Sequence, residues 1–361
     1  STYTLISTGS GAYASGVLAP NGDIHFIPYN LGRGQKVSVL GIVSTYTLVY
    51  TAASAFSAGV IATNGDIQYI PSTGTRGQKI SAAGIVSTYT LVYTNINGAY
   101  DAGALAPNGD IYFVPESATV GQKVSSAGVV STYSLAYNAS LAYAGGVLAA
   151  NGDLHFVPNQ AARGQKVSAT GVVSTYSLVY TNASGAYFGG VLAPNGDIHF
   201  VPYNGNRGQK ISAAGTVSTY SLAYTAGQAY FGGVLAPNGD IHFVPYNASV
   251  GQKISASGVV STYSLIYTAS FAYFGGVLAP NGDVHFVPSG ATVGQKIAAD
   301  GTVSTYSLVY TVATGYRGAI IAPNGDIHFV PYFAAVGQKI STLSAKNFSP
   351  LLAQSPFFNK L

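Results

Sequence analysis

Three residue types are missing from this chain and charged residues are scarce. The 361 residues contain no Cys, no Met and no Trp, and only 7% are charged, against about a quarter in an average soluble protein. Without Cys no disulfide can support the fold, and the redox compartment cannot be inferred. Without Met, Ser1 is no translation start, so we expect either a clipped initiator or a piece of a longer chain.

Long apolar runs and a charge imbalance are also missing. No run approaches the ~18 apolar residues of a membrane helix, so we expect no membrane insertion. Most charges belong to eight Asp and eight Lys at equivalent positions, and the remainder gives a net charge of +4. Because this is no basic patch, we expect no nucleic-acid partner.

The chain is rich in repetition. Asn-Gly-Asp begins at eight positions, 43 or 44 residues apart: Asn21, Asn64, Asn108, Asn151, Asn195, Asn238, Asn281 and Asn324. Asn-Gly between short apolar runs is typical of a type I′ hairpin, because both central residues need positive φ. One such unit cannot bury its own apolar face, so the eight units must stack into one body.

Each unit predicts four short strands. In the sixth copy we expect them at 229–236, 241–245, 252–255 and 262–267, with Gly232 and Gly233 allowing a close backbone approach near a crowded axis. Four antiparallel strands in about 43 residues are typical of a propeller blade. The sequence therefore predicts an all-β fold, a single eight-bladed β-propeller of four-stranded antiparallel blades.

The two ends of the chain predict how the ring closes. The chain opens with a fourth strand at 2–6, and its last unit stops after three strands, at Ser341. If the opening strand pairs into the last blade, the termini seal the ring. We therefore predict a propeller over 1–341 and a non-repetitive C-terminal tail over 342–361. The tail is expected to strap onto the ring or dock into a partner through Leu351, Leu352, Phe357 and Phe358.

Comparison of the eight copies predicts a uniform face and a variable face. The turn after the first strand is always Asn-Gly-Asp, and the turn after the third strand is nearly constant. The loop after the second strand keeps five residues but changes in content, and the loop between units also changes in length. Because strand direction alternates, the two variable loops lie on one face.

The unit resembles the NHL and YVTN classes of propeller repeat, in which a Pro-Asp/Asn-Gly-Asp/Asn turn links the first two strands. The phrase LAPNGDIHFVP at 192–202 and the ending SPFFNK at 355–360 also resemble repeat proteins of aquatic phages and large viruses. The near-identity of the copies is similar to that of a recently amplified propeller. The resemblance implies the architecture of the repeats and brings no catalytic motif with it.

Three polar positions recur from unit to unit, and we call each such set of equivalent residues a column. Each of the three columns has competing interpretations. Six histidines share one position of the second strand, which holds Gln68 and Tyr112 in the other two units: His25, His155, His199, His242, His285 and His328. They could form a ring of imidazoles around a metal or anion, or be polar side chains between blades that hydrogen-bond a neighbour. We favour the second interpretation, because eight-fold mates lie too far apart to share one metal. No metal and no cofactor is expected.

The other two polar columns are the Asp of the Asn-Gly-Asp turn and the Lys of Gly-Gln-Lys. One carboxylate per turn is too few for calcium, which needs six to eight oxygens, so turn chemistry explains the Asp column. The lysines could recognise glycans or acidic groups, or tie blades together through Asp or a carbonyl. We favour the interpretation in which the lysines tie blades together.

Tyrosines and arginines beside the variable loops are the candidate binding residues. One tyrosine column precedes the first strand, at the edge of the variable face: Tyr13, Tyr100, Tyr143, Tyr187, Tyr230, Tyr273 and Tyr316. Four tyrosines and four arginines occur in or after the variable five-residue loops: Tyr29, Tyr203, Tyr246, Tyr332, Arg33, Arg76, Arg163 and Arg207. Stacking on a sugar ring or a partner is the expected role.

No enzymatic activity is expected, because few carboxylates lie outside the repeated columns and no copy clearly differs from its mates. We predict a non-enzymatic structural and interaction module displayed on a virion or cell exterior. One face or the tail would anchor it, with the variable loops facing outward. The alternative is a multivalent lectin-like binder. The expected partner is a protein of a larger assembly or a cell-surface glycan, and the expected location is extracellular or the virion surface.

Overall fold

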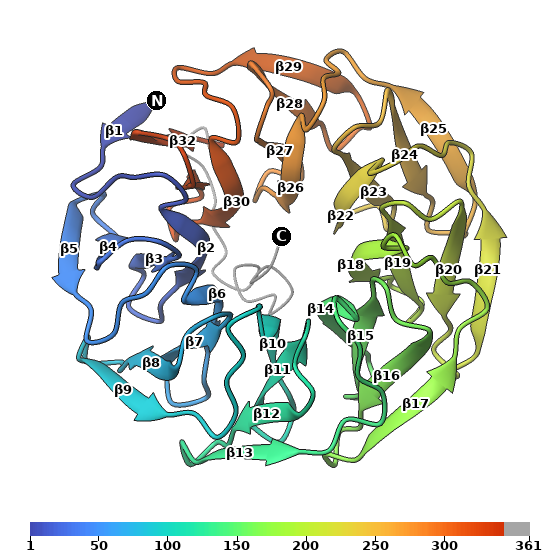
Figure 1. Ribbon diagram of the computed structural model, residues 1–361. Helices are drawn as coiled ribbons and strands as arrows, with labels where there is room; N and C mark the ends of the chain where they lie inside the picture. The colour runs from blue at the N-terminus through green and yellow to red at the C-terminus, as the bar shows by residue number, and fades with distance from the viewer. Residues whose placement is uncertain (343–361) are drawn as a thin grey trace.

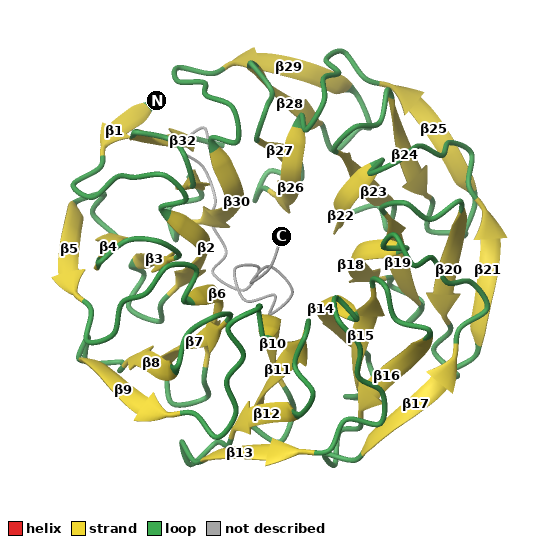
Figure 2. Ribbon diagram, viewed as in Figure 1, coloured by secondary structure: helices red, strands yellow, loops and turns green. Residues whose placement is uncertain are grey.

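The structure is a computed structural model, and it describes residues 1–342. These residues form eight four-stranded antiparallel sheets around a central axis (Figure 1 and Figure 2). No helix occurs in residues 1–342, and so none that could cross a membrane. The predicted all-β, eight-bladed propeller is confirmed. We number the blades 1 to 8 in the order of their innermost strands.

Within a blade the strands follow one another outward from the axis. The innermost strands are β2 (Tyr13–Leu18), β6 (Phe56–Ile61), β10 (Tyr100–Leu105), β14 (Tyr143–Leu148), β18 (Tyr187–Leu192), β22 (Tyr230–Leu235), β26 (Tyr273–Leu278) and β30 (Tyr316–Ile321). The second strands are β3 (Ile24–Pro28), β7 (Ile67–Pro71), β11 (Ile111–Pro115), β15 (Leu154–Pro158), β19 (Ile198–Pro202), β23 (Ile241–Pro245), β27 (Val284–Pro288) and β31 (Ile327–Pro331).

The outer half of each blade is built the same way. The third strands are β4 (Arg33–Val37), β8 (Arg76–Ile80), β12 (Gly121–Val124), β16 (Arg163–Val167), β20 (Arg207–Ile211), β24 (Val250–Ile254), β28 (Val293–Ile297) and β32 (Val336–Ile340). The outermost strands are β5 (Val43–Thr47), β9 (Val86–Thr90), β13 (Val130–Tyr133), β17 (Val173–Ser177), β21 (Val217–Ser221), β25 (Val260–Ser264), β29 (Val303–Ser307) and, in blade 8, β1 (Thr2–Thr4).

The core lies between blades as much as within them. All residues of the second strands are buried, because both faces of each sheet are covered by its neighbours. Val244 of blade 6, for example, shares an apolar cluster with Tyr273 and Phe286 of blade 7. One such cluster bridges each pair of blades, so no blade has a core of its own.

The ring closes through the N-terminal strand, as predicted. Strand β1 pairs antiparallel with β32, with Tyr3 opposite Gly337, and Figure 1 shows the N-terminus beside β32. The Lys339 N–H donates to the Ser1 carbonyl at 2.9 Å. Residues 343–361, with Leu351, Leu352, Phe357 and Phe358, lie outside the described residues, so the predicted role of the tail stays a prediction.

A buried glutamine ties each blade to the preceding one. Gln295 in blade 7 is fully buried, and its Oε1 accepts the N–H groups of Ile266 and Tyr267 at 3.0 Å each. These two residues follow β25 of blade 6. The outermost strand of blade 6 therefore ends at Ser264 and not at Tyr267 as predicted, because the next N–H groups bond to a side chain of blade 7.

The innermost strand carries a bulge at its start. In β22 the register shifts between Tyr230 and Gly233, and Gly232 has φ of 82°. A Cβ atom on Gly233 would lie 3.0 Å from the Val191 side chain of blade 5, so the predicted close approach is confirmed at Gly233. Bulges re-aim side chains, and the residue between Tyr230 and Gly232 is Phe231.

Candidate functional site

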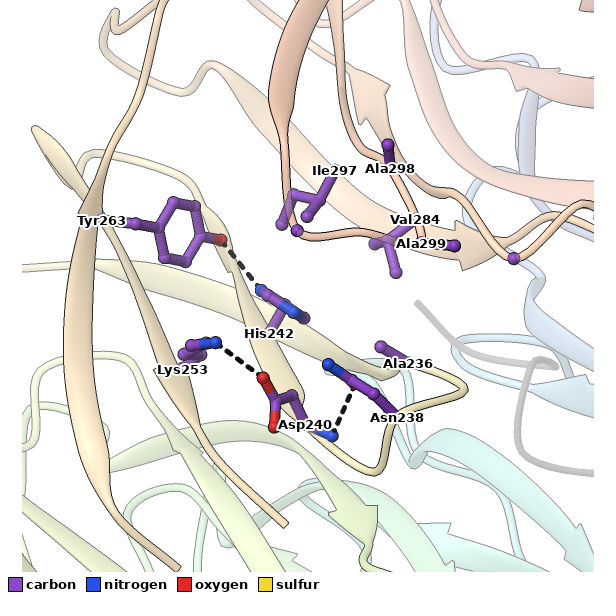
Figure 3. Close-up of a pocket in the computed structure, with 12 residues that line it drawn as sticks. Ala236, Asn238, Asp240, His242, Lys253, Tyr263, Val284, Ile297, Ala298 and Ala299 are labelled. Carbon is purple, nitrogen blue, oxygen red and sulfur yellow. Dashed lines mark hydrogen bonds and ion pairs between the residues drawn. The ribbon is translucent and has the colours of Figure 1, made fainter.

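The uniform face is held together by the Asp and Lys columns. In blade 6, Lys253 Nζ lies 2.6 Å from Asp240 Oδ2 (Figure 3). The Ala256 N–H donates to Asp240 Oδ1 at 3.2 Å. The pair recurs in all eight blades at 2.5–2.7 Å. Burial raises the pKa of the Asp240 carboxyl, but the hydrogen bonds and the charge of Lys253 outweigh it and hold that pKa below its usual value. The Asp–Lys pair is present, but both partners belong to one blade, so the predicted tie between blades is wrong.

Each of the six histidines forms a hydrogen bond inside its own blade. His242 Nδ1 lies 3.4 Å from the Tyr263 hydroxyl, and the other five pairs are 3.2–3.4 Å apart (Figure 3). The six rings are only 3–6% exposed. Burial, with the charge of the blade's lysine, lowers the His242 pKa to about 4, so the ring is neutral at neutral pH. Within residues 1–342 no group of three His, Cys, Asp or Glu side chains is placed to hold a metal ion.

Small cavities open between blades on the uniform face. One of about 60 Å³ between blades 6 and 7 is lined by Asp240, His242, Lys253 and Tyr263 (Figure 3), and one of about 40 Å³ lies between blades 4 and 5. Organic ligands need roughly 300 Å³ or more. In the larger cavity Asp240 already bonds to Lys253, and Tyr263 to His242, so these cavities suit water and not an organic ligand.

The tyrosine column before the first strand is closed to ligands. All seven members are at most 1% exposed: Tyr13, Tyr100, Tyr143, Tyr187, Tyr230, Tyr273 and Tyr316. Tyr230, for example, packs against Phe243 and donates its hydroxyl to the Val250 carbonyl at 3.0 Å. This corrects the expectation that the column stacks on a sugar: its rings belong to the blade core and offer no free face.

The four predicted arginines do not converge on a site. Arg33, Arg76, Arg163 and Arg207 begin third strands of blades 1, 2, 4 and 5, and all are exposed. They are therefore spread round the ring, two strands away from the innermost layer. They offer separate surface charges.

A position of broken symmetry lies on the innermost strands. The second residue of these strands is, in blade order, Ala14, Ser57, Asp101, Ala144, Phe188, Phe231, Phe274 and Arg317. Phe231 lies 3.9 Å, centroid to centroid, from both Phe188 and Phe274 of the neighbouring blades. Equivalent residues of adjacent blades approach so closely only near the axis, where Figure 1 places β18, β22 and β26. We call Phe188, Phe231, Phe274 and Arg317 the axial arc.

Arg317 ends the axial arc between two aromatic rings. Its guanidinium carbon lies 3.7 Å from the centroid of Tyr332 and 5.1 Å from that of Phe274, which is cation–π geometry. Its Nε–H is buried and has no hydrogen-bond partner among the described residues.

The loop tyrosines predicted as ligand residues flank the arc. Tyr246 lies 5.4 Å from Phe231, and Tyr203 lies 5.7 Å from Phe188. Tyr29 lies 6.0 Å from Tyr332. Burial raises the pKa of Tyr203, Tyr246 and Tyr332, and the charge of Arg317 opposes that rise at the last two. The structure therefore brings these four tyrosines to the axial arc on the variable face.

The other half of the ring has a different chemistry at this position. Ala14 and Ala144 are small, Ser57 donates to the Tyr100 carbonyl at 3.0 Å, and Asp101 of blade 3 is four blades from Phe274. The arc is thus confined to blades 5 to 8. The arc was not predicted, because it lies neither in the variable loops nor in the constant positions of the repeat. The available signal was one changing residue between a Tyr or Phe and two small residues, each Gly, Ala or Ser.

The loops beside the arc hold strained backbone. Phe271 and Thr314, in the loops before β26 and β30, have φ of 56° and 55°, a region that costs a non-glycine residue about 1 kcal/mol or more. The Phe271 ring is 47% exposed and lies 5.0 Å from Tyr246. Ser54, Leu141 and Gln228 have a similar φ of 52–54° in the equivalent loops of blades 2, 4 and 6, so this strain belongs to the repeat and does not single out the arc.

Comparison with known proteins identifies the fold and no family. No protein-family model matches the chain, and no curated protein matches it. Solved structures are similar: a streptogramin B lyase (TM-score 0.63, 22% identity, covering 80% of this chain and 94% of that chain), and virginiamycin B lyase from Staphylococcus aureus (TM-score 0.64, 17% identity, 86% and 99%). A catalytically inactive variant of the latter with quinupristin is similar too (TM-score 0.62, 17% identity, 86% and 99%).

These likenesses show the propeller fold alone, and enzymes occur among rings of this architecture. They correct the predicted function. The expected non-enzymatic module on a virion or cell exterior, with a lectin-like binder as alternative, is wrong, because the similar structures are lyases and nothing in them points to a virion, adhesion or lectin role. They also give no support to the expected resemblance to proteins of phages and large viruses.

Proposed function

We propose that this protein binds one small organic molecule per ring, with a flat apolar body that stacks against the axial arc. The observation that carries the proposal is the row of Phe188, Phe231 and Phe274 at successive positions round the axis, 3.9 Å apart. Phe188 and Phe274 remain partly exposed. Aromatic side chains kept at a surface without a protein partner are typical of binding sites.

The number of sites follows from the broken symmetry. Eight equivalent sites would need eight equivalent aromatic residues, whereas only blades 5, 6 and 7 have Phe at this position. Phe231 is only 6% exposed between Phe188 and Phe274, so a ligand would contact these two outer rings and the flanking tyrosines, at about 0.5–1.5 kcal/mol per ring–ring contact beyond area burial. A neighbour of the same fold was solved with quinupristin, which supports an organic ligand for such a ring.

The expected absence of enzymatic activity, the extracellular location, and a protein or glycan partner remain predictions. Incubation of a bound aromatic compound with the protein, followed by mass spectrometry, tests the first of these: we expect the compound to be recovered unchanged.

The binding test uses the neutral fluorophore N-phenyl-1-naphthylamine as the probe. We expect one site per ring and at least a ten-fold loss of affinity when Phe188, Phe231 and Phe274 are all changed to Ala. The matched control changes three exposed apolar residues near the rim, Val179, Ile266 and Val309, to Ala, and should leave affinity unchanged. If the triple arc variant does not fold, the milder pair Phe188→Ser and Phe274→Ser replaces it.

Two outcomes would overturn the proposal. Equal probe affinity in the arc and control variants would place binding elsewhere on the ring. Binding that appears only when the full chain carries Phe357→Ser and Phe358→Ser would instead make the chain's own C-terminal segment the occupant of the arc.

A further inference from the structure

We infer that the ligand of the axial arc is an aromatic anion, with a carboxylate or sulfonate group bound by Arg317. This inference rests on the proposed function and narrows it to a ligand class. It starts from the one cation that the symmetry-breaking position holds, at the end of a row of three phenylalanines.

Arg317 has a charge that no carboxylate of the described chain balances. The ion pairs within residues 1–342 are the eight Asp–Lys pairs of the uniform face, and Arg317 belongs to none. The side chain is only partly exposed, and its Nε–H is buried without a hydrogen-bond partner. A cation partly withdrawn from water gains most from an anion that can also accept its hydrogen bonds.

The aromatic neighbours of Arg317 determine where such an anion can bind. Tyr332, 3.7 Å from the guanidinium carbon, covers a face of the group. The N–H donors of a guanidinium point outward in its own plane, and a carboxylate or sulfonate can accept two of them at once. The free donors are therefore offered at the edge of the group, beside the aromatic row.

The spacing limits the size of the ligand. The guanidinium carbon lies 5.1 Å from the centre of the Phe274 ring, and Phe231 lies 3.9 Å beyond Phe274. A molecule that stacks on these rings and reaches Arg317 must carry its charge on the aromatic system or one or two bonds from it. Aryl carboxylates and aryl sulfonates meet this requirement, whereas a charge on a long flexible chain does not.

The test compares two probes that differ in one group. 8-Anilinonaphthalene-1-sulfonate has the skeleton of N-phenyl-1-naphthylamine with an added sulfonate. We expect the sulfonate probe to bind the full-length protein about ten-fold more tightly than the neutral probe, because a charge-assisted hydrogen bond contributes that much. Added salt should reduce this preference, since Arg317 is partly exposed.

Substitutions locate the preference. Arg317→Gln should remove the preference for the sulfonate probe and leave the neutral probe's affinity within two-fold, and Arg317→Lys should restore part of the preference. The control Arg207→Gln removes an exposed arginine of blade 5 and should change neither affinity.

The outcomes separate this inference from the proposed function. If the neutral probe binds at the arc but the sulfonate gives no advantage, or if Arg317→Gln leaves the advantage intact, the ligand class is wrong and the aromatic site stands. If neither probe responds to the arc variants, the proposed function fails and this inference fails with it.

Discussion

At the scale of single residues, the six buried imidazoles make stability depend on pH. Each ring is neutral in the folded state, and burial lowers its pKa from the ordinary 6.5 to about 4. Above pH 6.5 the ring is neutral in both the folded and the unfolded chain. As pH falls from 6.5 toward 4, only the unfolded chain takes up the proton, so the free energy of unfolding decreases over that window.

We therefore predict a steep loss of stability between pH 6.5 and 4, up to about 1.4 kcal/mol per pH unit for each histidine. Denaturant unfolding at several pH values measures it. His242→Gln, which copies the natural Gln68 of blade 2, should reduce proton uptake on unfolding by about one. A free energy of unfolding that is constant from pH 7 to 5 would contradict the prediction.

The candidate site was only half predictable at this scale. The loop tyrosines Tyr203, Tyr246 and Tyr332 were predicted because they lie in loops of the variable face. Phe231 and Arg317 could not be placed from the sequence, because their direction depends on a bulge that a strand pattern does not reveal. Tyr230 was wrongly predicted to contact a ligand, because Tyr230 faces the blade core and its neighbour Phe231 faces the axis.

At the scale of elements, the blades depend on the glutamine tie. Gln252 of blade 6 is fully buried, and its Oε1 accepts the N–H groups of Ala223 and Tyr224 at 2.9 and 2.8 Å. Both donors follow the outermost strand of blade 5. The bond therefore stabilises a strand end of one blade from inside the next, where no backbone partner is available.

We predict that Gln252→Leu decreases the free energy of unfolding by about 2–4 kcal/mol, because two N–H groups lose their acceptor. Thermal and denaturant unfolding measure the loss. Gln160→Leu, in the variable loop of blade 4, is the matched control and should change it by less than about 0.5 kcal/mol. Equal effects of the two substitutions would show that the tie contributes little.

The sequence predicted the second strands to the residue and the outermost strands poorly. The expected 241–245 coincides with β23, because the Asn-Gly turn fixes one end and Pro245 the other. The expected 262–267 is shifted from β25 (Val260–Ser264). Tyr and Leu continue to alternate past Ser264, but the backbone N–H groups of Ile266 and Tyr267 donate to Gln295 of the next blade and not to a strand. No local sequence pattern can indicate this.

At the scale of the whole molecule, the first residues complete the last blade. Leu5 is 6% exposed within an apolar cluster of blades 8 and 1, and the Tyr3 hydroxyl lies 3.2 Å from His328 Nδ1. Gln35 Oε1 accepts the N–H groups of Ile6 and Ser7. Blade number, strand order and closure were all predictable, because the repeat count and the position of its interruption are explicit in the sequence.

Deletion of residues 1–8 should lower the melting temperature by several degrees or more, since it removes this strand and exposes an edge of β32. A synthetic peptide of residues 1–8 should raise the melting temperature of the shortened ring in proportion to the logarithm of its concentration. The same peptide with Tyr3→Ser and Leu5→Ser should not. Unchanged melting after the deletion would contradict a role of β1 in closing the ring.

The pairing of Ser1 with Lys339 also has a kinetic consequence. It joins residues 338 apart, so forming it last costs roughly 5 kcal/mol of chain entropy, and until then the edge of β32 stays unpaired. Every third strand of this ring presents a similar Gly-Gln-Lys edge to a similar Ser-Thr-Tyr segment. During refolding at high concentration, the first strand of one chain can therefore complete the last blade of another, so swapped dimers and longer assemblies compete with the closed monomer.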